Sequence, residues 1–148
     1  MTRWLMVALL LSGCAAERRA AERSELPAQP SAAQWIARAS ESHARADRTH
    51  DRGGLRDLVT AAEQAPPGAI AERDAVLVRQ DLYVHAATLA LELGELEHAD
   101  QLAQRGLALP LREGPLRRQL FIVSSRIRAA RGDEAAAERD RAAARDTP

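Results

Sequence analysis

A 38-residue repeat, anchored by two glycines, limits what this chain can fold into more than any other feature of its sequence. Gly94 and Gly132 occupy equivalent positions in the two copies of the repeat. An aromatic residue lies 11 positions before each glycine, a small residue 7 before, and small residues 5 and 12 after. These residues are Tyr83, Ala87, Ala99 and Gly106 in one copy, and Phe121, Ser125, Ala137 and Ala144 in the next. Helices joined by a glycine turn approach closely only where side chains are small, so the pattern predicts stacked helical hairpins with the aromatic residue between neighbours.

Apolar spacing and turn residues divide the chain after residue 30 into six predicted helices. Between residues 69 and 93, apolar residues recur at three- and four-residue steps, which favours a helix with one buried face. We expect helices over about 32–49, 55–65, 69–93, 95–109, 115–131 and 134–145. Ser31 and Gln34 match a capping box, Gly53-Gly54 is expected to separate the first two helices, and Asp133 to cap the last. No stretch has the alternation of a strand, so the sequence predicts an all-α fold of three antiparallel hairpins.

The repeat resembles the tetratricopeptide repeat (TPR), a two-helix unit of about 34 residues. The resemblance rests on Tyr83, Ala87, Gly94, Leu96, Ala99 and Gly106. It covers residues 81–111 well and 121–144 less well, because Arg128 and Glu134 stand where large apolar residues are expected. In the first hairpin Ala46, Gly53 and Ala65 fit, but Leu58 replaces a small residue. The resemblance implies a right-handed α-α superhelix; a plain helical bundle is the alternative for a chain so rich in alanine.

The TPR resemblance also implies a groove lined by the first helix of each hairpin. Carried over to this sequence, the groove residues are Asp81, Val84, Thr88, Leu91 and Glu92 in the second hairpin, and Gln119, Ile122 and Arg126 in the third. This mixture of apolar and polar residues suits an extended peptide or a partner helix. The alternative for Val84, Leu91 and Ile122 is a place in the core.

The start of the chain, over residues 1–14, has the layout of a signal peptide. Arg3 precedes the apolar run Trp4–Leu11, and the small residues Ser12 and Gly13 precede Cys14. The run is too short to span a membrane, which takes about 20 apolar residues. Leu11-Ser12-Gly13-Cys14 resembles the lipobox of bacterial lipoproteins, which implies cleavage between Gly13 and Cys14 and lipidation of Cys14. The alternative is an ordinary secreted protein.

These features predict three segments: a signal peptide over 1–13, the lipidated cysteine with a flexible tether over 14–30, and a TPR-like domain over 31–148. The tether lacks an apolar stripe and ends in two prolines, Pro27 and Pro30. By the sorting rule of such lipoproteins, Ala15 after the cysteine implies a cell-envelope location at the outer membrane, facing the periplasm.

Charge and composition point away from nucleic acid and from catalysis. The 21 basic residues, all of them arginine, balance 21 acidic residues and are interspersed with them, which is unlike a nucleic-acid-binding surface. His43 and His50 share a helix face near Asp47 and Asp51, but a polar helix face has the same pattern. His85 and His98 are expected on no common face, each half-exposed. We therefore expect no metal, no cofactor and no enzymatic activity.

The sequence as a whole predicts a membrane-anchored scaffold that binds an envelope protein or peptide. The alternative is a structural lipoprotein that associates with itself, because a chain with only 3% aromatic residues builds an alanine-rich core that buries little area per residue.

Overall fold

A computed structural model describes residues 30–66 and 73–148. The predicted signal peptide, Cys14 and nearly all of the predicted tether lie outside the described residues. The described parts form six helices and no strands: α2 (Ala32–Thr49), α3 (Arg52–Glu63), α4 (Arg73–Glu92), α5 (Leu96–Leu107), α6 (Pro115–Ala130) and α7 (Glu134–Asp146). The all-α prediction is confirmed. None of these helices is both long and apolar enough to cross a membrane.

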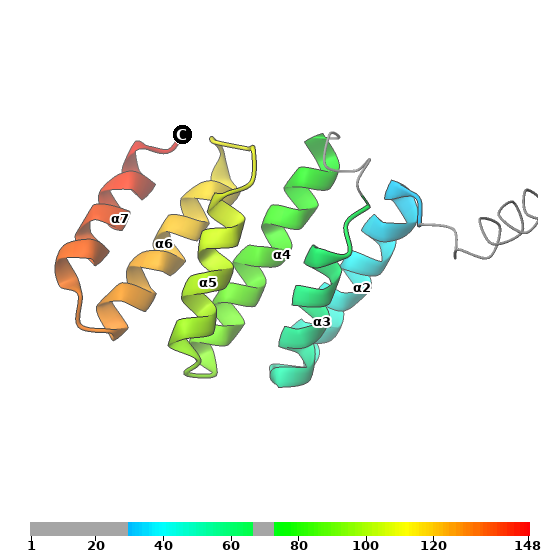
Figure 1. Cartoon of the computed structure of the whole chain (residues 1–148), viewed down its shortest axis with the longest axis horizontal. Helices are drawn as coiled ribbons and strands as arrows, with labels where there is room; N and C mark the ends of the chain where they lie inside the picture. Colours follow the sequence, from blue (N-terminus) through cyan, green and yellow to red (C-terminus); the bar gives the residue numbers. More distant parts are fainter. Residues whose placement is uncertain (1–29, 67–72) are drawn as a thin grey trace, which may run out of the picture.

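The helices lie in a row that follows the chain, from α2 at one end to α7 at the other (Figure 1). Chain neighbours α2 and α3, α4 and α5, and α6 and α7 pack most extensively, and we refer to them as helix pairs. Helix α4 lies at the centre and packs against α2, α3, α5 and α6. It is accordingly buried on most of its circumference.

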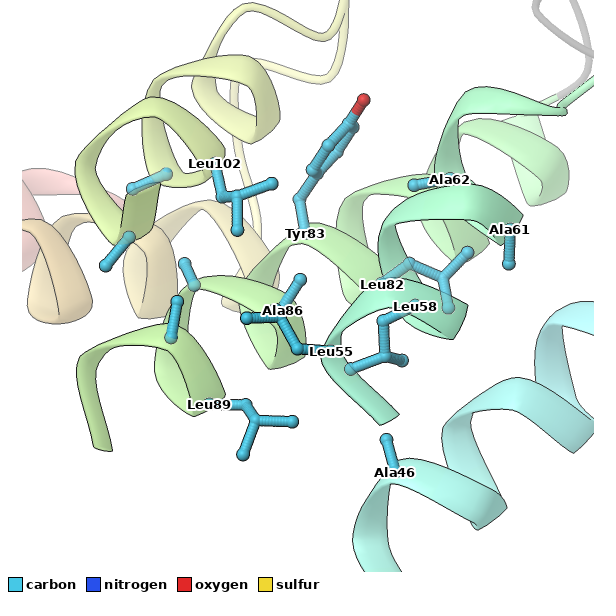
Figure 2. Close-up of a cluster of buried hydrophobic side chains, with 14 of the residues drawn as sticks. Ala46, Leu55, Leu58, Ala61, Ala62, Leu82, Tyr83, Ala86, Leu89 and Leu102 are labelled. Atoms are coloured by element: carbon cyan, nitrogen blue, oxygen red, sulfur yellow. The ribbon is translucent and has the colours of Figure 1, made fainter. Parts of the chain in front are cut away.

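The core is built from leucine and alanine, with few large side chains. Figure 2 shows Leu55 and Leu58 of α3, Leu82, Tyr83, Ala86 and Leu89 of α4, and Leu102 of α5 gathered in one cluster. Alanines such as Ala62, Ala86 and Ala87 are fully buried and let helix axes approach. Trp35 is the large exception: it is buried in α2, and its indole Nε1 donates to the carbonyl of Ala61 in the last turn of α3 at 2.8 Å. That carbonyl has no partner within its own helix.

Several helix ends form where local sequence signals predicted them. Ser31 and Gln34 make both bonds of the capping box at the start of α2. Asp133 accepts from the backbone N–H of Ala136 at the start of α7, and Pro115 stands in the first turn of α6. Residues 69–72, expected to open α4, lie outside the described residues.

The break between the first two helices was predicted at the wrong residues. Gly53 and Gly54 lie inside α3, and the turn falls instead at His50 and Asp51. His50 takes the left-handed backbone conformation (φ 46°), and the Asp51 carboxylate caps α3 by accepting from the backbone N–H of Gly54. Gly54 serves packing instead, because a Cβ there would lie 2.8 Å from the Cα of Ala46.

The two anchoring glycines end their helices in the same way. Gly94 (φ 77°) and Gly132 (φ 81°) follow α4 and α6. Glu95 N–H donates to Ala90 and Gly94 N–H to Leu91, and the same two bonds recur from Asp133 and Gly132. This is the Schellman arrangement, which places a left-handed residue after the helix. The turn that joins α4 to α5 is therefore repeated between α6 and α7, in backbone structure as well as in sequence.

An arginine four residues before the aromatic residue is part of the same repeat, and the sequence analysis missed it. The Arg79 guanidinium lies 5.9 Å from the centre of the Tyr83 ring, and Arg117 lies 5.3 Å from that of Phe121. Each arginine also donates to a carbonyl at the end of the preceding helix, Arg79 to Ala62 of α3 and Arg117 to Leu107 of α5. Each therefore joins an aromatic ring to the end of the helix before it.

Candidate functional site

The predicted groove residues of α4 differ in exposure. Val84 is buried with only 6% of its surface exposed, whereas Asp81, Thr88 and Leu91 are half-buried and Glu92 is exposed. The Thr88 hydroxyl donates to the carbonyl of Val84 within the helix at 2.8 Å. On this helix a partner could therefore reach polar and partly apolar edges, but not the side chain of Val84.

The predicted residues of α6 are more open. Gln119, Ile122 and Arg126 are exposed. Among the described residues, Ile122 is the one large apolar residue that is exposed, with 44% of its surface accessible. Ile122 lies in a shallow hollow of about 410 Å³ between α6 and α7, whose rim carries Arg118, Arg141 and Arg145. The hollow thus combines an apolar floor with a rim of arginines, of which Arg141 and Arg145 are ion-paired with Glu134 and Glu138.

A larger hollow of about 550 Å³ lies at the other end of the row, between α2 and α3. Its lining is mostly polar and includes the charged residues Arg38, Glu41, Arg45 and Asp57. Arg45 and Asp57 form an ion pair at 2.7 Å, so these two side chains already balance each other's charge. This hollow was not predicted from the sequence.

The most distinctive chemical grouping lies where α2 packs against α4. The rings of His43 and His85 approach to 3.8 Å between centroids and are inclined by 61°. Asp47 lies one turn after His43, at 3.9 Å from Nε2, and Asp81 lies one turn before His85, at 3.6 Å from Nε2. We call these four residues the histidine cluster.

The members of the histidine cluster act on one another electrostatically. The Asp81 carboxylate raises the pKa of His85 above its usual value against the opposing effect of burial, and the charge of Asp47 adds to this. In return, His85 lowers the pKa of Asp81, and His43 contributes to the same shift. The Nε2 atom of His43 is buried and has no hydrogen-bond partner among the described residues.

The structure groups the histidines differently from the sequence analysis. His50, which was considered with His43, is exposed at the end of α2, and His43 instead meets His85. His85 and His98 are both half-exposed, as expected, and His98 pairs with Glu95. The sequence held one signal for the cluster: a histidine and an aspartate spaced by four residues occur on each of two predicted first helices.

The repeat-packing residues are mostly buried where helices meet. Tyr83, Ala87, Ala99, Gly106, Ser125, Ala137 and Ala144 are buried, Phe121 is half-buried, and Gly94 and Gly132 lie in turns. At Gly106 an added Cβ would lie 2.8 Å from Leu120 and 3.0 Å from Tyr83, so α5 meets both α4 and α6 at this glycine.

Comparison with known proteins returned no match to a family model, to a curated protein or to a solved structure.

Proposed function

We propose that this chain is a lipid-anchored protein of the cell envelope whose TPR-like stack of helices holds a protein or peptide partner. Leu11-Ser12-Gly13-Cys14 supports the anchor, with Cys14 as the lipidated residue. The proposed location is the outer membrane, with the helical domain in the periplasm and no catalytic role.

The packing of the first helices is the observation that carries the scaffold proposal. Helix α2 packs against α4, and α4 against α6, whereas close packing among α3, α5 and α7 is slight at most. Long side chains bridge the α3 and α5 regions instead, through the ion pairs Arg52–Glu95 and Arg105–Glu63. In a stack that curves, the more closely packed helices lie on the concave side, the side on which such repeats bind partners.

The proposed partner surface is centred on α6 and on the hollow between α6 and α7. Ile122 offers an apolar anchor, while Thr88, Gln119 and Arg126 offer polar contacts on α4 and α6. A peptide or helix with one apolar side chain matches the apolar floor of the adjacent hollow. An acidic residue beside that side chain would compete with Glu134 and Glu138 for the rim arginines.

Site-specific photocrosslinking in cells tests the partner surface. We expect probes at Thr88, Gln119 and Ile122 to give one shared envelope product, and a probe at exposed Arg139 of α7 to give none. Crosslinks between copies of this chain, together with a concentration-dependent oligomer in sedimentation, would favour the self-associating structural lipoprotein. Equal products from Arg139 and from the three test positions would contradict the surface.

Membrane fractionation and intact mass test the anchor separately. We expect Cys14→Ser to remove the lipid mass and to release the chain from the membrane fraction. The variant has no thiol to lipidate, and stable attachment needs several acyl chains. The matched change Gly13→Ala keeps a small residue before the cysteine and should preserve both properties. Membrane attachment that survives Cys14→Ser would exclude the lipid anchor without affecting the partner surface.

A further inference from the structure

Three members of the histidine cluster, His43, Asp47 and His85, have no part in the proposed partner surface. They come from two helices of different pairs and are brought together only by the packing of α2 against α4. The cluster is therefore a product of the stack and not a local sequence motif.

The geometry of these three residues is that of a small set of metal ligands. Each offers one nitrogen or oxygen atom, and these atoms all lie within 4.8 Å of one another. Ligands of a four-coordinate zinc ion, bonded at about 2.0–2.2 Å, stand about 3.4 Å apart, so the donor atoms have little more than about 1 Å to close, a distance on the scale of a side-chain rotation.

The unpartnered nitrogen of His43 favours a bound ligand over a simple polar surface. The buried Nε2 of His43 lacks a hydrogen-bond partner among the described residues, and at 3.9 Å the Asp47 oxygen is too distant to provide one. A buried polar atom left unpartnered costs free energy, and an ion bound there would remove that cost. Asp47 is on the open side, with 61% of its side chain exposed, which leaves a path for an ion to enter.

We propose that His43, Asp47 and His85 bind one divalent transition-metal ion, and that zinc is the ion whose preferences they match best. Two imidazoles and one carboxylate are a donor set that zinc takes, with a fourth position left for water. Asp81 lies 3.6 Å from Nε2 of His85, close enough for its charge to help orient that ring.

Such an ion would join α2 to α4, two helices that are not neighbours along the chain. Its binding free energy would then stabilise the stack, since an ion that binds only the folded chain shifts the unfolding equilibrium. The site depends neither on lipidation nor on a partner.

Zinc titration of the whole chain by calorimetry, in metal-free buffer, tests the proposal. We expect one equivalent of zinc per chain, and loss of that equivalent in His43→Ala and in His85→Ala. Circular dichroism of each variant shows that it is folded. His98→Ala, His50→Asn and Cys14→Ser each remove another potential ligand and should leave the equivalent in place.

A milder substitution keeps the test independent of folding. Asp47→Asn changes one exposed atom, and we expect it to weaken zinc binding by about 10-fold or more. Its matched control is Glu41→Gln on the same helix, because Glu41 lines the hollow between α2 and α3 and not the cluster. Cobalt(II) as a probe should give the intense visible bands of a tetrahedral site in the parent chain and not in His85→Ala.

Zinc should also raise the thermal midpoint of the parent chain by several degrees and leave that of His43→Ala unchanged. Failure of the parent chain to take up zinc would overturn the proposal. So would uptake of equal affinity in the parent and in folded His43→Ala, which would place the ion elsewhere.

Discussion

At the scale of single residues, two kinds of position carry an energetic cost: left-handed residues at helix ends and buried polar atoms without a hydrogen-bond partner. Three of the described helices end at a left-handed residue, and two of them use Gly94 and Gly132. The third uses His50, whose Cβ makes that conformation costly. The amide of Gln80 is buried in α4, and its Nε2 has no partner among the described residues.

Replacing His50 with glycine should stabilise the protein by about 0.5–1 kcal/mol, because glycine adopts a left-handed conformation without strain. Gly132→Ala is the reciprocal change. Nothing lies within 4 Å of the Cβ that it would add, so it should cost about 1 kcal/mol through backbone strain alone. Urea denaturation measures both changes. A loss of stability in His50→Gly would mean that the imidazole makes a stabilising contact.

Gln80→Met should leave stability unchanged or raise it by about 1 kcal/mol. The change keeps the length of the side chain and removes a buried donor that lacks a partner. The free energy of unfolding in urea measures the effect. A loss as large as that of a core truncation would show that the amide makes a hydrogen bond in solution.

At the scale of the helix, side chains that cap the helix ends or donate to their open carbonyls stabilise each element. Asp51 begins α3, and arginines of α4 and α6 satisfy carbonyls that α3, α5 and α7 leave open at their ends. Arg79 and Arg117 do this while lying over an aromatic ring of their own helix. This double contact explains why the spacing between arginine and aromatic residue recurs.

The cap of α3 should weaken in acid. The Gly54 N–H, with help from Thr49, lowers the pKa of the Asp51 carboxyl below its usual value of about 4. A lowered pKa in the folded state gives stability that is present above the unfolded value and is lost as pH falls through the folded one. Asp51→Asn keeps the capping oxygen but does not titrate, so the variant should lose less free energy of unfolding below about pH 4 than the parent chain does. Identical acid profiles for the two proteins would contradict this role.

Arg117→Met should destabilise the protein by about 1–2 kcal/mol, since it removes the hydrogen bond to Leu107 and the contact with Phe121. Arg117→Lys should not restore the loss, because an ammonium lacks the planar fork that serves both contacts. Arg126→Met on the exposed face of α6 is the control and should change stability by less than about 0.5 kcal/mol. Equal effects at both positions would contradict the double contact.

At the scale of the whole molecule, the helices form the row seen in Figure 1, and burial is uneven along it. Helix α4 packs against four other helices, whereas α7 packs chiefly against α6 and buries only three alanines. In a stack where each unit contacts its neighbours, stability should fall toward an end helix that packs chiefly on one neighbour and buries only small side chains.

Native-state hydrogen exchange should show this gradient. We expect the amides of α4 to exchange slowest, through global unfolding, and those of α7 to exchange fastest, through local opening of the last helix. The ion pair Arg128–Asp140 at 2.7 Å ties α7 to α6, so Asp140→Asn should speed exchange in α7 without affecting α4. Uniform exchange across all six helices would mean that the row unfolds as one unit.

Local signals in the sequence were enough to predict the helices and most of their ends. Ser31, Asp133, Gly94 and Pro115 act on the backbone within a few residues, so their effects can be read from the chain alone. The same holds for the repeated glycine turn of the last two pairs. The error at Gly53-Gly54 arose because a glycine can serve either a turn or a close approach of two helices, and only packing distinguishes them.

Tertiary structure alone decided which side chains meet. His43 and His85 lie far apart in the sequence, on helices of different pairs, and Arg79 reaches Ala62 across a helix boundary. Such contacts depend on the angle and rotation at which helices pack, and helical periodicity does not specify either. Val84 is buried and Ile122, at the equivalent position one repeat later, is exposed, because α4 packs between other helices whereas no described helix after α7 covers α6. The sequence determined the helices and most of their ends, and the packing of the helices determined which side chains meet.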